Sequence, residues 1–385
     1  MSVGFILFIM FIGSYHDKIN KLNELSIMNP ILDLSEITQK IGRLFIGCIP
    51  GPELDDQTIT LIRDYHLGGI ILFDRNIRDP IQLARLCKDL QKVSMENSGL
   101  PLFLAIDQEG GRVARLKEPF TQFPGNAAIV ESPDPEQAAL HFASTAAREM
   151  SLVGLNMNMA PVVDVAQPNM DTHLVGRPFS HDPLQVASLG KIVINTLQQG
   201  GIMAVAKHFP GLGKSDLDPH LHLPTIHATL EEMESMHLPP FVSAIEAHVS
   251  AIMSSHAVYP ALEPGIPATL SRRIMTDLLR ERMGFDGLII SDDLEMGAIS
   301  KERGLPQGAA DAFEAGIDLL LICSNQSLLL ASMELIRDRV LREDIPYERL
   351  EESIERIAEY KKRFLYPPKK ISLKAVKEFS GNMDA

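Results

Sequence analysis

Residues 207–222, KHFPGLGKSDLDPHLH, gather titratable side chains in one glycine- and proline-rich stretch. The apolar run before it, 201–206, predicts a buried strand, and Pro210 and the neighbouring glycines turn the chain into a loop. Ionisable groups in a loop at the carboxyl end of a strand favour a chemical role, with a solvated polar loop as the alternative. The residues concerned are Lys207, His208, Asp216, Asp218, His220 and His222.

A second stretch of this kind is GLIISDDLEM at 287–296. Its apolar part predicts a strand, and Asp292 and Asp293 follow where that strand ends. Reactive groups of α/β barrels occur at the carboxyl ends of buried parallel strands. One of the two aspartates is therefore a candidate nucleophile, while the other, like Ser291, suits capping of the following helix.

Polar residues also follow three other predicted strands. The segment after 102–106 holds Asp107 and Arg115, which suit binding of hydroxyl, amide or carboxylate groups, and Glu109, which we interpret as the support of a strand-end arginine. A single buried Asp–Arg pair is usually structural, but clusters at several corresponding strand ends predict one polar pocket for a hydroxyl-rich ligand. The other polar residues are Asp74, Arg75 and Asn76 after 69–73, and Asp164, His173 and Arg177 at or after the end of 156–165.

Short apolar strands alternate with helix-length segments from residue 42 onward, which predicts an α/β fold, a single-domain TIM-type (β/α)8 barrel. Asp182 and Ser271 are expected helix caps. A doubly wound open sheet is the alternative, without a GxGxxG or P-loop to support it. The expected strands are 43–49, 69–73, 102–106, 156–165, 203–206, 251–254, 288–291 and 319–323. The expected helices are 80–93, 135–153, 183–199, 230–248, 271–283, 307–315, 327–342 and 347–364.

The composition narrows the class of partner. The chain has 385 residues, a formal net charge of −14 and no basic cluster, which argues against nucleic acid and anionic membrane surfaces. Cys48, Cys87 and Cys323 stand singly in apolar settings, so buried free thiols in a reducing compartment are expected. The histidine-rich loop suggests zinc as an alternative, but HExxH and paired cysteines are absent from the sequence, and we expect no metal and no cofactor.

Residues 3–12, VGFILFIMFI, form an apolar run that is too short for a spanning helix of roughly 20 residues. No basic residue precedes it and no good cleavage site follows it, as a signal peptide would require. We expect an apolar extension at 1–27, a catalytic barrel at 28–366 and a C-terminal tail at 367–385, in a cytoplasmic protein. Export or membrane association through the apolar extension is the alternative.

Seven stretches together resemble glycoside hydrolase family 3, and within it the short single-domain β-N-acetylglucosaminidases that cut muropeptides in cell-wall recycling. They occur in the family's order, and KHFPG with a downstream D-x-H is highly specific. The stretches are LGGIILFDRN (67–76), AIDQEGGRVARL (105–116), APVVDV (160–165), GRPFSHDP (176–183), KHFPGLG (207–213), DPH (218–220) and FDGLIISDDLEM (285–296).

The resemblance implies a retaining glycosidase with Asp292 as nucleophile, His220 as acid/base and Asp218 as the partner of His220. A histidine suits this role because its unperturbed pKa of about 6.5 lets it donate and accept a proton near neutrality. Since successive strand side chains alternate, Asp293 is expected to point away toward the following helix. The resemblance further implies that the sugar is bound by Asp107, Arg115, Arg177, Lys207 and His208.

The chain departs from the family pattern at Leu212, Lys214 and Pro219, where the family usually has His, an acidic or small residue, and Ser. These differences bear on loop motion and leaving-group preference more than on the type of reaction. The expected substrate is a small saccharide or muropeptide, and the expected assembly a monomer without a stable membrane partner. A β-glucosidase or xylosidase, a phosphorylase of the same family, and a non-catalytic sugar-binding barrel are the alternatives.

Overall fold

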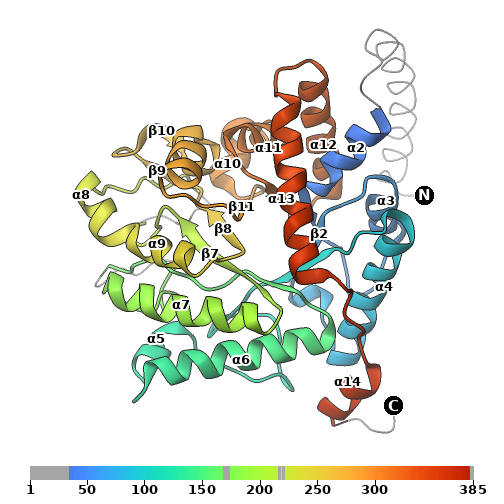
Figure 1. The fold of residues 1–385 in the computed structure, drawn as a ribbon, viewed down its shortest axis with the longest axis horizontal. Helices are drawn as coiled ribbons and strands as arrows, with labels where there is room; N and C mark the ends of the chain where they lie inside the picture. Colours follow the sequence, from blue (N-terminus) through green and yellow to red (C-terminus); the bar gives the residue numbers. More distant parts are fainter. Residues whose placement is uncertain (1–33, 168–173, 216–217, 219–221, 382–385) are drawn as a thin grey trace.

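The computed structural model describes residues 34–167, 174–215, 218 and 222–381. Eight parallel strands close into a barrel in the order β1-β12-β11-β8-β7-β6-β3-β2, and helices surround it (Figure 1). The apolar residues of these strands are buried on both faces of the sheet, as in parallel sheets covered by helices. This confirms the predicted single-domain (β/α)8 barrel. The barrel strands are β1 (Phe45–Gly47), β2 (Gly69–Leu72), β3 (Phe103–Ile106), β6 (Met157–Asn158), β7 (Met203–Phe209), β8 (Ala251–Ser254), β11 (Leu288–Asp293) and β12 (Leu319–Leu321).

Several outer helices begin in the same way. Asp79, Asp134 and Asp182 accept backbone N–H groups of the first helical turn, and a proline follows each of them. Asp182 is thus confirmed as a cap, and Ser271 Oγ likewise accepts the N–H of Ile274. The longer outer helices are α2 (Leu34–Arg43), α3 (Asp56–Asp64), α4 (Pro80–Ser98), α6 (Pro135–Val153), α7 (Pro183–Gln199), α9 (Pro239–Glu246), α11 (Leu305–Ala315), α12 (Gln326–Leu341) and α13 (Tyr347–Leu365).

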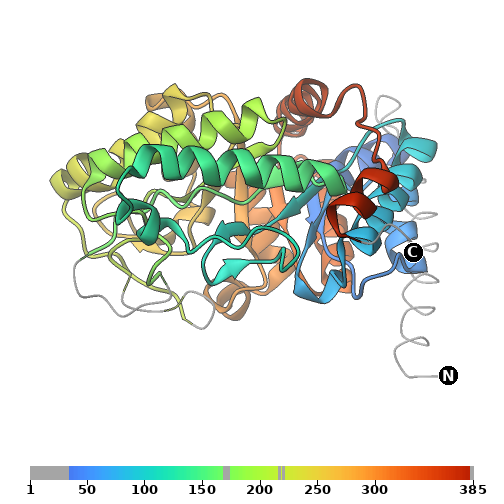
Figure 2. The ribbon, with the colours of Figure 1, turned by 90° about the horizontal axis from the view of Figure 1, so that it is seen from below.

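Smaller elements complete the ring and rim of the barrel. Two antiparallel pairs, β4 with β5 and β9 with β10, lie outside the barrel sheet. In Figure 2, α6 and α7 run side by side along one flank of the molecule. The smaller elements are β4 (Gln108–Gly110), β5 (Val113–Ala114), β9 (Val258–Tyr259), β10 (Glu263–Pro267), α5 (Asn126–Val130), α8 (Leu230–Glu232), α10 (Gly297–Arg303), the 3-10 helices η1 (Asp74–Asn76) and η3 (Ala268–Leu270), and the π-helical segments η2 (Met233–His237) and η4 (Arg273–Arg282).

Several predicted boundaries differ from the structure; for example, the strand expected at 156–165 is only Met157–Asn158, and the helix expected at 80–93 continues to Ser98. Strand β7 continues to Phe209, so Lys207 and His208 lie within the strand and not just after it. The helix expected at 230–248 is divided into α8, η2 and α9. The break before α9 falls at Pro239, which has no N–H to continue the hydrogen bonds of a preceding helix.

The C-terminal segment contains a packed helix where the sequence predicts only a tail. Helix α14 (Leu373–Phe379) lies against α4 and α6 (Figure 2). Val376 is fully buried, and the rings of Phe379 and Phe120 lie 5.4 Å apart. Val376 and Phe379 are three positions apart and so share one helix face, which explains the docking.

In the part of the chain that the structure describes, every helix is too short or too polar to cross a lipid bilayer.

Candidate active site

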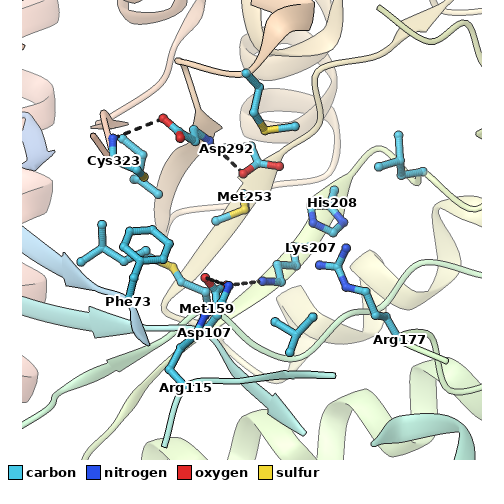
Figure 3. A pocket seen from close by; sticks show the side chains of 16 residues that line it. Phe73, Asp107, Arg115, Met159, Arg177, Lys207, His208, Met253, Asp292 and Cys323 are labelled. Atoms are coloured by element: carbon cyan, nitrogen blue, oxygen red, sulfur yellow. Dashed lines mark hydrogen bonds and ion pairs between the residues drawn. The ribbon is translucent and has the colours of Figure 1, made fainter. Parts of the chain in front are cut away.

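A pocket opens where the carboxyl ends of the barrel strands meet (Figure 3). Asp292 comes from β11, Lys207 and His208 from β7, and Asp107 from the residue after β3. Parts of the chain that lie far apart in sequence therefore supply one site. Six of the eight residues that the sequence resemblance singles out line the pocket: Asp107, Arg115, Arg177, Lys207, His208 and Asp292.

Glu109 is the centre of a buried group of ion pairs that we call the mouth cluster, formed by Asp107, Glu109, Arg177 and Lys207. Its two oxygens accept from Nε and Nη2 of Arg177, each at 2.9 Å, and Oε1 lies 2.7 Å from Lys207 Nζ. The same Nζ donates to Asp107 Oδ1 at 2.9 Å. The predicted role of Glu109 as the support of an arginine is confirmed, and the arginine is Arg177.

Charge compensation fixes the ionisation states of the mouth cluster. Burial alone would raise the pKa of Glu109, but Lys207 and Arg177 lower it to about 2. Burial alone would lower the pKa of Lys207, but Asp107 and Glu109 raise it above its usual value. The pocket therefore presents stable cations, held in place, which suit binding of sugar hydroxyl oxygens.

A second buried carboxylate, Asp164, orients His208. Asp164 is fully buried, and its Oδ2 lies 2.7 Å from Nδ1 of His208. Its Oδ1 accepts the backbone N–H groups of His208 at 3.2 Å and Leu212 at 2.6 Å. Burial acts to raise the pKa of Asp164, but His208 and these N–H groups lower it. Because an ionised carboxylate only accepts, Nδ1 of His208 carries a hydrogen.

Asp292 lies at the end of β11 and faces the cations of the mouth. Its Oδ1 accepts the backbone N–H of Asp293 at 2.8 Å. Burial acts to raise the pKa of Asp292, but His208, His256, that N–H and Lys207 lower it. An ionised carboxylate in this position is what a nucleophile at an anomeric carbon requires.

The expectation that Asp293 points away toward the following helix is confirmed only in part: its carboxylate does contact the turn before α10, but Asp293 also lines the pocket. The pairing of β11 with β12 shifts register between Ile290 and Asp293, which interrupts the strand alternation. Oδ1 of Asp293 accepts the N–H groups of Glu295 at 3.1 Å and Cys323 at 3.3 Å, so it binds the turn before α10. Burial, with help from Glu295 and Asp292, raises the pKa of Asp293 to about 7.

Arg115 forms the opposite wall of the pocket. Its guanidinium lies 3.7 Å from Asp107 and 3.6 Å from Asp74, and 5.7 Å from the centre of the Phe73 ring. Its Nε is buried and has no hydrogen-bond partner within the described protein. A bound ligand oxygen would satisfy this donor.

The loop that should carry the acid/base is only partly described. Asp218 is half-buried, while His220, with Asp216 and Pro219, lies outside the described residues, as does His173. Lys214, at the start of this loop, pairs with Glu232 on α8 at 2.6 Å. The neighbouring His222 and His227 are exposed, in agreement with their interpretation as ordinary loop residues.

Sequence reasoning missed several parts of the site. Asp164 was recognisable only as a strand-end carboxylate, because its contact with His208 joins residues 44 positions apart. Nothing in the spacing of Glu109, Arg177 and Lys207 indicated that they meet. The remaining lining residues include Phe73, Met159, Leu212, Met253, Met296 and Cys323.

All three cysteines are buried as expected. Within the described ranges, no group of three or more His, Cys, Asp or Glu side chains is arranged to hold a metal ion.

A (β/α)8 barrel with an ionised carboxylate and buried cations at the carboxyl ends of its strands defines an α/β-barrel enzyme for a small polar substrate. The sequence pattern described as "Glycosyl hydrolase family 3 N terminal domain" matches residues 17–360. The chain therefore belongs to glycosyl hydrolase family 3.

The similarity of individual relatives, in sequence and in structure, also supports membership of this family. A beta-hexosaminidase of Pseudomonas aeruginosa is 34% identical over 293 residues, which cover 75% of this chain and 86% of the relative. Beta-hexosaminidase A of Pseudoalteromonas piscicida is 37% identical over 289 residues, covering 70% of this chain and 47% of the relative. A family 3 beta-N-acetylglucosaminidase structure from Paenibacillus sp. str. FPU-7 superposes with a TM-score of 0.83 at 35% identity, covering 89% of this chain and 68% of that one.

Proposed function

We propose that this protein is a retaining β-N-acetylhexosaminidase that releases terminal β-linked N-acetylglucosamine from peptidoglycan-derived saccharides. The observation that carries the proposal is the ionised Asp292 at the barrel mouth, facing Lys207, His208 and Arg177 across a pocket of sugar-binding character. The names of its relatives, beta-hexosaminidase and beta-N-acetylglucosaminidase, support the choice of sugar.

The proposed reaction has two steps with Asp292 as the nucleophile. In the first, a carboxylate oxygen of Asp292 bonds to the anomeric carbon, the bond to the leaving oxygen breaks, and protonated His220 donates its proton to that oxygen. In the second, neutral His220 takes a proton from water, the water oxygen bonds to the anomeric carbon, and the bond to Asp292 breaks. Two inversions retain the β configuration.

Asp218 is assigned to orient the imidazole of His220 and to stabilise its cation. Two positions separate them in the chain, and Asp218 is half-buried. The mouth cluster and His208 hold the sugar: Lys207, Arg177 and Arg115 donate to its hydroxyl oxygens, while Asp107 accepts. These residues touch the ring before and after bond cleavage and so supply positioning as well as affinity.

The choice of sugar and acceptor is tested with nitrophenyl glycosides. N-acetyl-β-glucosaminide should be cleaved with a far higher kcat/KM than β-glucoside, and free N-acetylglucosamine should be the product with and without phosphate. Comparable kcat/KM on the two sugars would contradict the proposed specificity. Formation of the sugar 1-phosphate would identify a phosphorylase, and no cleavage of either would favour a non-catalytic sugar-binding barrel.

The assignment of the acid/base is tested by His220→Ala and Asp218→Ala. Each should slow turnover of substrates with poor leaving groups, for His220→Ala by about 10²–10⁴-fold. The loss should shrink for aryl leaving groups of low pKa, which need little protonation. His222→Ala, at an exposed histidine two residues further on, is the matched control and should retain wild-type rates. Near-normal rates of both loop variants on poor leaving groups would show the assignment to be wrong.

A further inference from the structure

His256 contacts the residue that follows the proposed nucleophile, and it does not line the pocket. It follows β8, the barrel strand between β7 and β11, and is fully buried. Its Nε2 lies 3.0 Å from the backbone carbonyl oxygen of Asp293. Because a carbonyl oxygen only accepts, Nε2 must carry a hydrogen.

The second ring nitrogen contacts a threonine with several partners. Nδ1 of His256 lies 2.7 Å from Oγ1 of Thr269. The same Oγ1 lies 3.0 Å from the carbonyl oxygen of Ser255 and 2.7 Å from Oγ of Ser254. A threonine hydroxyl has one hydrogen, so it donates to only one of three partners: the Ser255 carbonyl, Nδ1 of His256 or Oγ of Ser254.

Counting hydrogens distinguishes two arrangements. If His256 is neutral, Thr269 donates to Nδ1, and the contact between Oγ1 and the Ser255 carbonyl is no longer a hydrogen bond. If His256 is an imidazolium, Nδ1 donates to Thr269, Thr269 donates to Ser255, and Ser254 donates to Thr269. Only the charged arrangement makes a hydrogen bond of every one of these side-chain contacts. In the neutral arrangement the Ser255 carbonyl still accepts the backbone N–H of Thr269 at 3.3 Å.

A buried imidazolium also requires a counter-charge. The carboxylate of Asp292 supplies it: burial raises the pKa of Asp292, and His208 and His256 are the largest influences that lower it. The residue whose carbonyl accepts from His256 is Asp293, and its N–H binds Asp292 Oδ1. One histidine thus acts on the proposed nucleophile both by charge and through the backbone of the next residue.

We propose that His256 is a positioning residue for Asp292, which acts as an imidazolium: it holds the Asp293 backbone that binds the Asp292 carboxylate, and it keeps that carboxylate ionised. This inference deepens the proposed function and rests on Asp292 being the nucleophile. His256 is not among the residues that line the pocket, so we assign it no contact with substrate.

The direction of the expected pH effect follows from the surrounding charges. Removing the imidazolium leaves burial of Asp292 less compensated, so the pKa of Asp292 should rise and the acid limb of kcat/KM should move to higher pH. Lys207 and His208 remain in the variant and still lower the pKa of Asp292, so its rise should be partial. Among the described residues, the titratable and charged groups on the elements packed around His256 include Asp292 and Asp293 on β11, Lys207 and His208 on β7, Tyr259 on β9 and Glu263 on β10.

Two substitutions separate the donor from the charge. His256→Leu removes both, while His256→Gln can keep an N–H donor toward the Asp293 carbonyl but carries no charge. His256→Leu should lower kcat/KM at least about tenfold, equally for good and poor leaving groups, the scale of one hydrogen bond to a charged group. His256→Gln should recover part of the rate, and the acid limb should move upward in both. An unmoved acid limb in folded variants would overturn the proposal.

Thr269→Val tests the hydrogen count, with Thr145→Val as the same change at a buried threonine on α6. Thr269→Val should move the acid limb upward because Nδ1 loses its acceptor, whereas Thr145→Val should leave it in place. Thermal unfolding checks that each variant folds. Equal behaviour of the two threonine variants would overturn the assigned role of the Thr269 contact.

A measurement independent of turnover completes the test. In ¹⁵N-histidine-labelled protein, the signals assigned by their loss in His256→Gln should show both ring nitrogens protonated at the pH of maximal activity. A neutral ring with hydrogen on Nε2 alone would overturn the proposal. Wild-type cleavage of N-acetyl-β-glucosaminides tests the proposed function separately, because the ring signals report on His256 whether or not that cleavage occurs.

Discussion

The barrel carries buried charge clusters at both ends, and they differ in what surrounds them. At the mouth, Glu109 joins Lys207 and Arg177 beside an open pocket. At the opposite end, fully buried Asp318 precedes β12 and forms a base cluster with three arginines. The arginine contacts are Arg280 at 2.8 Å, Arg356 at 2.7 Å and Arg349 at 3.7 Å.

The base cluster is saturated by the protein itself. Asp318 also accepts from Ser353 Oγ and from the backbone N–H of Ile289, while Arg280 donates to the carbonyls of Phe285 and Gly287. The mouth leaves groups for a ligand, among them the buried Nε of Arg115 and the carboxylates of the β11 end. Buried ion pairs therefore do not by themselves mark a site, and position at the carboxyl ends of the strands together with unsatisfied groups does.

The difference between the mouth and the base of the barrel is tested most severely by removing one carboxylate from each end. Asp292→Asn should lower kcat by at least about 10⁴-fold, the scale for removing a nucleophile, with an unfolding midpoint close to that of the wild type. Initial rates and thermal unfolding of the purified variant check this. Substantial residual turnover would remove Asp292 from the mechanism.

Asp318→Asn should show the opposite pattern. Loss of the carboxylate leaves buried arginines uncompensated and should lower the free energy of unfolding by about 3–5 kcal/mol. The kcat/KM of the folded fraction should stay near the wild-type value. Denaturant unfolding combined with activity below the transition measures both, and a large loss of kcat/KM in folded protein would show that the two ends are not independent.

Glu109→Gln should combine both effects, because Glu109 holds sugar-facing cations and is itself buried. Misplacement of Lys207 and Arg177 should lower kcat/KM by about 10²-fold. The pKa of Glu109 falls from its ordinary 4.5 to about 2 on folding, so its contribution to stability is present above pH 4.5 and is lost as pH falls toward 2. Acid unfolding curves should therefore be flatter for the variant over that interval, and an unchanged slope would contradict the ion-pair account.

The smallest expected effect is at Asp293. Its pKa rises from 3.8 to about 7 on folding, so the stability that it contributes is present below pH 3.8 and is lost as pH rises through 7. Asp293→Asn should remove a slope of up to about 1.4 kcal/mol per pH unit between these values, while kcat changes little. Unfolding free energies at pH 5 and pH 8 test this: the variant should lose less stability than the wild type between them.

The eight barrel strands were predictable because each is a short apolar run buried on both faces, and the polar residues after five of these runs marked the mouth. The direction of the Asp293 side chain was not predictable, because nothing in the residues SDDL indicates the register shift between β11 and β12. The hub role of Glu109 was not predictable either, since Arg177 and Lys207 reach it from 68 and 98 positions further along the chain (177 − 109 and 207 − 109). Alternation and capping are local rules, whereas these contacts depend on how the barrel closes.

Trapping of the glycosyl-enzyme tests the central claim, direct attack by Asp292, most directly. A 5-fluoro or 2-deoxy-2-fluoro glycosyl substrate should accumulate a covalent adduct that mass spectrometry of peptides locates on Asp292, within FDGLIISDDLEM. The Asp292→Asn variant should give no adduct, and Asp293→Asn should still give it. Strong inhibition by a thiazoline mimic without any adduct on Asp292 would show instead that the acetamido oxygen of the substrate is the nucleophile.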